Sequence, residues 1–181
     1  MTTHLQTLVP TLTTVPARAL LAVDGRGAPE DTSFAAAIRA LFAVRAALGA
    51  VDDVPLEGTY AQDGDALRFD LDAPHGWHWT LAVPAPPGRT AEAVATAGAR
   101  FGAPVELRAH PAEQVAELVH PGPYADEAPS LAALYAFVAR HGLRAAGAHT
   151  EVYLTDPGRT PPAGNRTILR VPVVGAPVCR D

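Results

Sequence analysis

The chain contains no lysine and a single cysteine, and these two shortages exclude several kinds of protein. All 14 basic residues are arginines scattered singly along the chain, and the net charge is −5, so no basic stripe is present to neutralise a row of phosphates. We therefore exclude nucleic acid as a direct partner. Cys179, near the C-terminus, allows neither a disulfide framework nor a cysteine-based metal site.

Long apolar segments are also missing. No run approaches the ~20 apolar residues that cross a membrane, and the polar N-terminal region, interrupted by Asp24 and Arg26, does not have the pattern of a signal peptide. We expect a cytoplasmic protein with no membrane partner. A hydrophobic content of 48% is sufficient for a core without disulfide or metal support, and the abundance of Ala, Pro, Gly and Arg is typical of a GC-rich bacterial coding bias.

The sequence contains no motif that is typical of a metal site or of a phosphate-binding loop. The seven histidines do not show the paired spacing with carboxylates that is typical of a metal site. The short run Gly25-Arg26-Gly27 is better interpreted as a turn than as a phosphate loop. The sequence therefore predicts no metal and no cofactor.

The alternation of apolar and polar residues predicts two similar halves, each with the order strand, helix, strand, strand. In the first half we predict a strand over residues 17–23 and a helix that is capped at Asp31 or Thr32 and reaches Leu48. Three further strands are predicted there, over residues 56–61, 67–71 and 77–83. An Ala-rich connector helix follows over residues 90–101 and ends at Gly102.

The second half repeats this order. We predict a turn centred on Pro121 and Gly122 and a helix from Pro129 to Gly142, with Tyr135 on its apolar stripe. Strands are predicted over residues 105–109, 114–119, 149–154 and 167–173. The expected fold class is α+β: two tandem modules related by pseudo-two-fold symmetry, one antiparallel sheet and a central ligand cleft. We expect one domain over residues 1–181, with halves at about 15–85 and 104–175 and the connector at about 89–102.

Glu151 is the residue that points most directly to a function. Alternation within its strand places His149, Glu151 and Tyr153 on one face, in a run that otherwise has the composition of a core. A carboxylate inside a protein is costly unless it is paired, hydrogen-bonded or available to a ligand. Two interpretations stay open, a structural ion pair with Arg170 on the closing strand, and a functional carboxylate that serves as a base or as a counter-charge.

Several stretches in a fixed order resemble the GyrI-like small-molecule-binding family, which includes the effector-binding domains of some multidrug-responsive transcription regulators. The stretches that carry the resemblance are residues 23–29, 37–42, 55–58, 77–81, 120–127, 149–157 and 167–173. The resemblance covers nearly the whole chain and implies the same two modules around a ligand cleft. It also implies a working site: in a stand-alone subgroup, the cyclopropanoid cyclopropyl hydrolases, aromatic walls and the glutamate matching Glu151 act on cyclopropane-bearing, DNA-alkylating natural products.

The sequence departs from the family pattern at four positions. It has Ala28 where Asp is usual and Phe42 where Tyr is usual. It also has Tyr60 where Trp is frequent and Thr150 where a second His is frequent. These departures bear on the ligand and on turnover more than on the fold.

Aromatic and histidine side chains supply the remaining candidates. Trp77 and Trp79 share one face of their strand, and we expect one ring in the core and at least one along the cleft, with Tyr60 and Phe42 as further wall residues. Tyr124, at a turn, serves either to pack the loop or to contact the ligand.

Two polar residues beside Glu151 and one histidine in a turn are further candidates. Tyr153 is the best hydroxyl for stabilising an oxyanion, and His149 is either a neighbour of Glu151 or a histidine satisfied by backbone. His120 is expected to bond to backbone within its turn.

The leading functional hypothesis is a hydrolase that captures a planar, apolar, electrophilic small molecule and adds water to it without a cofactor. Glu151 would activate the water and Tyr153 would stabilise the oxyanion. The alternative is a binding protein that sequesters drugs or lipophilic cations, and a third hypothesis is a protein inhibitor, for example of a topoisomerase. No DNA-binding helix pair precedes residue 17, which disfavours transcriptional regulation by this chain alone, and the sequence leaves the oligomeric state open.

Overall fold

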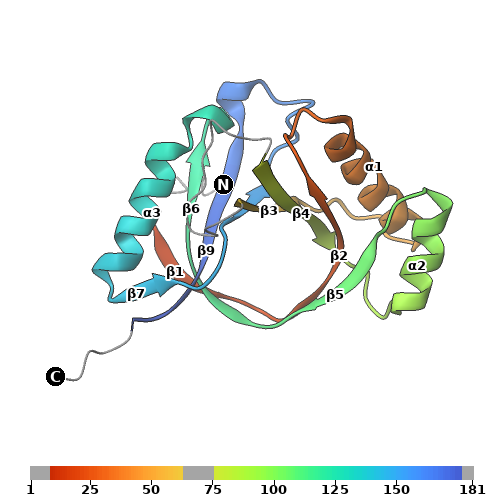
Figure 1. Cartoon of the computed structure of the whole chain (residues 1–181), viewed down its shortest axis with the longest axis horizontal. Coiled ribbons are helices and arrows are strands. Elements are labelled where there is room, and N and C mark those ends of the chain that lie inside the picture. Colours follow the sequence, from red (N-terminus) through yellow and green to blue (C-terminus); the bar gives the residue numbers. More distant parts are fainter. Residues whose placement is uncertain (1–8, 63–75, 177–181) are drawn as a thin grey trace, which may run out of the picture. The chain divides into compact units, whose positions relative to one another are not determined.

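The chain folds into two compact units, and Figure 1 labels most of their helices and strands. The computed structural model describes residues 9–62 and 76–176. We name residues 16–112 the tryptophan unit, and residues 9–15 together with 113–176 the glutamate unit. Each unit combines helices with antiparallel strands, so the predicted α+β class is confirmed. No helix of these described ranges is long and apolar enough to cross a membrane.

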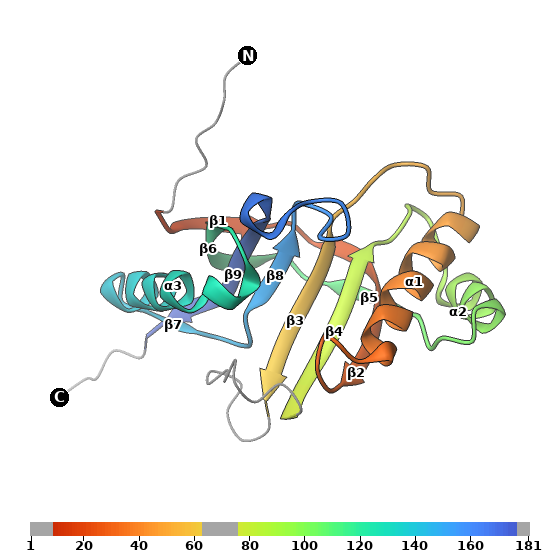
Figure 2. The same cartoon turned by 90° about the horizontal axis from the view of Figure 1, so that it is seen from above.

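The tryptophan unit contains four strands in the antiparallel order β3-β4-β2-β5. Its elements along the chain are β2 (Arg18–Arg26), α1 (Thr32–Ala47), β3 (Leu56–Gln62), β4 (Trp77–Pro84), α2 (Ala91–Arg100) and β5 (Glu106–His110). The first four give the predicted order strand, helix, strand, strand. Figure 2 shows β3, β4 and β2 side by side, with α1 and α2 next to them.

Both helices of this unit begin where the sequence predicts. Asp31 is the residue at the N-terminal cap position of α1, and its carboxylate accepts from the Ala28 amide in the preceding turn at 2.8 Å and not from an amide of the helix. Thr90 caps α2 by accepting from the Ala93 amide at 3.2 Å. The apolar side of α1, with Leu41 among its residues, packs on the sheet and forms the core of the unit.

Gly25 lies within β2 and not in the turn that we predicted for the run Gly25-Arg26-Gly27. It pairs with Trp79 in the register of β2 and β4, and a Cβ atom added at Gly25 would overlap the indole ring of Trp79. The glycine is therefore needed because the ring lies directly over the backbone. The chain turns two residues later at Gly27, which has a φ of 100°.

Replacing Gly25 with Ala should destabilise the protein, because the new methyl group displaces the buried Trp79 ring from its packing against Phe34. Overpacking of this kind costs roughly 1–3 kcal/mol of unfolding free energy. Urea unfolding of Gly25→Ala measures the loss. Gly175→Ala is the matched control, since nothing lies within 4 Å of a Cβ there. Equal unfolding free energies for the two variants would contradict this account of Gly25.

The glutamate unit has the antiparallel strand order β1-β6-β9-β8, with the short β7 also paired to β9. Its elements are β1 (Thr11–Val15), β6 (Glu113–Pro121), the 3-10 turn η2 (Tyr124–Asp126), α3 (Ala128–Arg140), β7 (Leu143–Ala145), β8 (Thr150–Tyr153), η3 (Pro162–Gly164) and β9 (Arg166–Gly175). Along the chain, β6, α3, β8 and β9 give the order strand, helix, strand, strand, and this confirms the second predicted module.

α3 covers one face of this sheet and builds the core of the glutamate unit. Leu134 and Val138 of α3 pack with Leu118 and Leu169 of β6 and β9, and Tyr135 is partly buried at the side of the same cluster, as its position on the apolar stripe predicts. Burial raises the pKa of the Tyr135 hydroxyl.

Two strand pairings differ from the grouping that the sequence suggested. β1 was not predicted, because its threonine-rich run has no apolar face, yet it pairs with β6. β5 was grouped with the second half, but it pairs with β2 in the tryptophan unit. A local pattern identifies a strand, whereas its partner depends on contacts distant in the sequence. The strand predicted over residues 67–71, and Cys179, lie outside the described residues.

Candidate functional site

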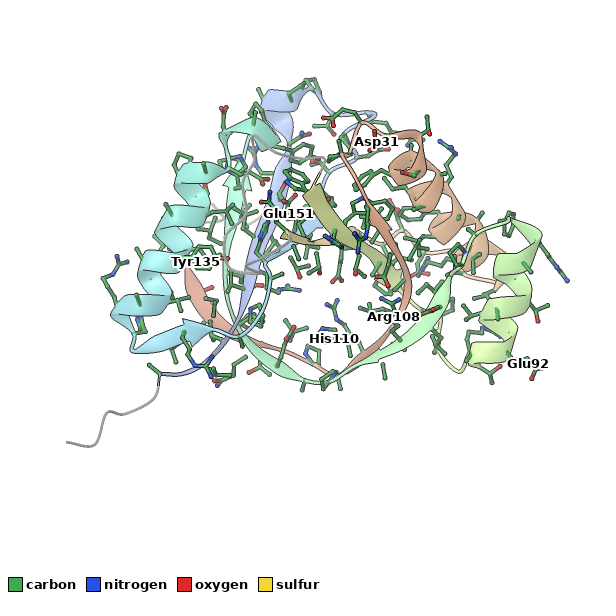
Figure 3. All side chains as sticks on the ribbon, viewed as in Figure 1. Asp31, Glu92, Arg108, His110, Tyr135 and Glu151 are labelled. Carbon is green, nitrogen blue, oxygen red and sulfur yellow. The ribbon has the colours of Figure 1, made fainter. Side chains whose placement is uncertain are left out.

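Glu151 lies inside the glutamate unit, on the face of the sheet that α3 covers. Its cross-strand neighbours in β9 and β6 are Leu169 and Leu118, which are core residues, and only 7% of Glu151 is exposed. Figure 3 labels Glu151 among the side chains. A carboxylate in this place loses most of its hydration, so it needs protein partners.

The ion pair with Arg170, one of the two interpretations of Glu151, does not form. Arg170 is opposite Thr150 in the register of β8 and β9. Adjacent residues of a strand point to opposite faces, so the Arg170 side chain lies on the other face of the sheet. There it donates from Nε and Nη2 to Glu117 at 2.9 Å.

Tyr153 in β8 and His149, the residue before β8, hold the carboxylate of Glu151. The Tyr153 hydroxyl donates to Oε2 at 2.8 Å, and Nε2 of His149 lies 3.4 Å from Oε1. His149 is 2% exposed. The predicted grouping of His149, Glu151 and Tyr153 is therefore present, and both carboxylate oxygens are oriented by neighbouring polar groups.

A second buried carboxyl group lies beside Glu151. Glu127 is the residue that precedes α3, and only 1% of it is exposed. Burial, together with the negative charge of Glu151 and a hydrogen bond with that carboxylate, raises the pKa of Glu127 to about 9. Glu127 is therefore protonated at neutral pH, and the pair consists of one carboxylic acid and one carboxylate.

Two tyrosines border the carboxyl pair. The rings of Tyr124 and Tyr153 meet edge to face, with centroids 5.6 Å apart. Burial, and then the charges of Glu151, Glu127 and Asp156, raises the pKa of the Tyr124 hydroxyl to about 12. The Tyr124 phenol is consequently neutral at physiological pH and available as a hydrogen-bond donor.

His120 fixes the turn that carries Tyr124 and Glu127. Its Nε2 lies 3.1 Å from the Pro123 carbonyl oxygen, and its Nδ1 lies 2.9 Å from the Ser130 hydroxyl on α3. A carbonyl can only accept, so Nε2 donates to it, and in the neutral imidazole Nδ1 accepts from Ser130. The expected bond between His120 and backbone is confirmed, and it ties β6 to the start of α3.

Three buried polar atoms of this unit have no hydrogen-bond partner among the described residues. They are Oε1 of Glu127, Oγ1 of Thr167 and Oδ1 of Asn165. Thr167 stands between Tyr153 and His120 in the cross-strand register, so it belongs to the same polar end of the core. Buried polar groups are almost always bonded, so unpartnered ones indicate a place where a water or ligand atom can bond.

The remaining predicted wall residues all lie in the tryptophan unit. Trp77, Trp79 and Tyr60 are 8%, 3% and 3% exposed, and all three belong to the core cluster of that unit. Trp79 packs edge to face on Phe34 at 5.2 Å, and Trp77 packs on Tyr60 at 5.8 Å. Core packing thus accounts for both tryptophans as they stand, while Phe42 is exposed on α1. That these four residues share a site with Glu151 stays a prediction.

Comparison with known families places this arrangement in context. The model of the GyrI-like small molecule binding domain matches residues 9–174. The chain belongs to this GyrI-like family. The resemblance seen in the sequence is thereby confirmed. No curated protein matches the chain in sequence.

Several solved structures with the GyrI-like fold are similar to this chain over nearly its full length. An uncharacterised conserved protein from Listeria innocua is 28% identical, with a TM-score of 0.80 and coverage of 94% of this chain and 95% of its own. A hydrolase from the same organism is 27% identical, with a TM-score of 0.78 and 94% of each chain covered. The protein SAV2435, solved bound to tetraphenylphosphonium, shares the fold at 11% identity and a TM-score of 0.50, with 92% and 94% covered.

Sequence reasoning missed Glu127 as a site residue, although it lies within the stretch 120–127 that carries the family resemblance. An acidic residue at the start of a helix is usually a surface group that favours the helix dipole. Nothing in the local pattern distinguishes that role from a buried one. The bonds of His120 to Pro123 and Ser130, which fix this turn, are visible only in the structure.

Proposed function

We propose that this GyrI-like protein binds a planar, apolar, electrophilic small molecule and hydrolyses it, which would make it a detoxifying enzyme. The observation that carries the proposal is the buried Glu151 carboxylate, held at both oxygens by Tyr153 and His149. A buried, oriented carboxylate is suited to removing a proton from water. The similarity to Listeria innocua proteins described as hydrolases supports the same reaction class.

The chemistry requires a ligand that water can open without a metal. In a conjugated ketone fused to a cyclopropane ring, attack by water breaks a strained carbon-carbon bond and leaves negative charge on the carbonyl oxygen. Glu151 is the base for the water in this proposal. Tyr153 donates its hydroxyl hydrogen to Glu151, so we assign it the orientation of that base in place of the oxyanion role expected from the sequence.

The aromatic side chains supply the recognition of a flat ligand in this proposal. Tyr124 and Tyr153 present adjoining rings next to the carboxyl pair. Trp77, Trp79, Tyr60 and Phe42 stay predicted wall residues. Stacking on such rings binds planar apolar molecules and adds roughly 0.5–1.5 kcal/mol for each ring pair.

Sequestration of a lipophilic cation is the second candidate function. A buried carboxylate next to two phenol rings can neutralise and cover a delocalised cation. The fold relative SAV2435 is bound to tetraphenylphosphonium, which is such a cation. In that case Glu151 would act as counter-charge and no bond would be broken.

Turnover in excess ligand separates the two functions. We expect wild-type protein, mixed with a large excess of a cyclopropane-bearing alkylator, to convert many equivalents to the ring-opened alcohol, because hydrolysis regenerates the site. Mass spectrometry of the small molecule counts the product. Loss of only one equivalent of alkylator, with tight binding of tetraphenylphosphonium, would overturn hydrolysis in favour of sequestration.

A further inference from the structure

Glu127 occupies a position where a carboxylate is ordinarily exposed. It directly precedes α3, and its backbone carbonyl accepts from the Leu131 amide at 2.9 Å, so its main chain is fixed in the first helical turn. The adjacent Asp126 is exposed, as expected at a helix start. Glu127 instead lies in the interior with 1% exposure, and this placement needs a reason other than helix capping.

The two carboxyl groups are not equivalent in their contacts. Glu151 receives a hydrogen bond from Tyr153 and has Nε2 of His149 beside its other oxygen. Oε1 of Glu127 has no partner among the described residues. Donors stabilise the ionised form of a carboxyl group. The contacts therefore assign the negative charge to Glu151 and the proton to Glu127.

The charged groups around the pair do not change this assignment. Arg170 binds Glu117 on the opposite face, and Arg166 donates to the backbone carbonyl of Asn165 at 2.8 Å. Asp126 and Asp156 are exposed acids, and their charge disfavours a second negative charge in the interior. His120 is engaged with Ser130 and Pro123. Two adjoining buried carboxylates without a compensating arginine share a proton.

We propose that Glu127 is a second catalytic residue, the acid that protonates the substrate's carbonyl oxygen when the Glu151-activated water opens the ring. This inference rests on the proposed hydrolytic function and names the substrate class more closely. The substrate is a neutral conjugated ketone whose carbonyl oxygen becomes a weakly acidic hydroxyl, such as that of a phenol, when the ring opens. Oε1 of Glu127 has no protein partner among the described residues and can donate to a ligand oxygen, and the hydrogen bond between Glu127 and Glu151 gives a route for resupply of the proton.

The proton balance of the step closes within the pair. The water oxygen bonds to the ring carbon while the strained carbon-carbon bond breaks, and that electron pair moves through the conjugated system to the carbonyl oxygen. Glu151 takes one proton from the water, and Glu127 gives its proton to the carbonyl oxygen. The pair now carries its proton on Glu151, and transfer back to Glu127 across their contact restores the starting state.

The test compares Glu127→Gln with wild-type protein in the same alkylator assay across a pH series. Gln has the size of Glu but carries no transferable proton, so we expect the rate of product formation to fall by roughly 10²-fold or more. The wild-type rate should decline above about pH 9, where Glu127 ionises, and this decline should be absent from the variant. Asp126→Asn, the exposed neighbour, is the matched control and should retain the wild-type rate.

A measurement on the resting protein supports or overturns the assignment without turnover. With ¹³C-labelled glutamate side chains, one carboxyl signal should titrate near pH 9, and Glu127→Gln should remove it. A Glu127 signal that titrates in the ordinary acid range overturns the proposal. So does a Glu127→Gln rate within about threefold of wild type.

These experiments distinguish failure of the acid role of Glu127 from failure of the proposed hydrolysis itself. If Glu151→Gln is inactive while Glu127→Gln is fully active, hydrolysis stands and the acid role of Glu127 falls. If wild-type protein forms no product, the proposed hydrolysis fails, and the acid role fails with it.

Discussion

We expect Glu151→Gln to lose most of the multiple turnover while keeping the fold intact. The amide cannot accept a proton from water, and loss of a general base lowers the rate by about 10²–10⁴-fold. Gln keeps the size of the side chain, and its amide oxygen can still accept from the Tyr153 hydroxyl, so the surrounding hydrogen bonds have a partner. The measurement is product formation from a cyclopropane-bearing alkylator in excess over protein.

The control for Glu151→Gln is again Asp126→Asn, which removes an exposed acid from the same unit. Both variants should give the same thermal unfolding midpoint as wild type within a few degrees. A Glu151→Gln protein with undiminished turnover would show that the buried carboxylate is not the base. If wild-type protein shows no turnover and the variant loses affinity for tetraphenylphosphonium, the carboxylate is the counter-charge of a cation trap.

Stability should fall as pH rises toward 9 in wild-type protein, relative to Glu127→Gln. The pKa of Glu127 is about 9 in the folded protein, against an ordinary value of 4.5. Between these values the folded chain holds a proton on Glu127 that the unfolded chain has released, so raising the pH favours unfolding. Below about pH 4.5 both states are protonated and the contribution of Glu127 is fully present; above about pH 9 it is lost.

The advantage of Glu127→Gln should therefore appear near pH 5, grow through pH 8 and level off above pH 9. A difference on the order of a few kcal/mol in the free energy of unfolding is expected at the upper end, because each pH unit contributes at most about 1.4 kcal/mol. Urea unfolding of both proteins at five pH values measures it. Titration of the other groups is common to both proteins and largely cancels in the difference. Parallel stability curves would show that Glu127 does not carry an extra proton.

The buried acids of the glutamate unit lie beside a row of polar side chains that a packed apolar core supports. His120, Thr167 and Tyr153 form a cross-strand row next to the row of Leu118, Leu169 and Glu151. The apolar rows continue under α3 and supply the core. The polar row is thus held by a packed scaffold, which is the arrangement that orients reactive groups without relying on mobile loops.

Most elements of the fold follow from local patterns in the sequence. The caps Asp31 and Thr90 mark two helix starts, and Gly102 and Gly142, both with positive φ, mark where α2 and α3 end. Period-two alternation located β3, β4, β8 and β9 closely. These signals depend on neighbours in the chain, so they can be read without tertiary information.

Pairing partners and close approaches do not follow from such patterns. β1 has a polar, threonine-rich sequence and forms a strand because β6 offers it hydrogen bonds. Gly25 resembles a turn residue in the sequence, yet it is a strand residue beneath the Trp79 ring. In both cases the deciding contact comes from a segment that is far away along the chain.

For the candidate site, the sequence by itself determined that His149, Glu151 and Tyr153 share a strand face, because alternation in an extended chain admits no other arrangement. Only the tertiary structure decided that this face is buried, that Arg170 binds Glu117 instead of Glu151, and that Glu127 turns inward beside Glu151. The physical reason is that burial and charge pairing arise from the packing of α3 over β6 and β9 and of Tyr124 in η2 against Tyr153 in β8. Residue order alone does not encode that packing in any local signal.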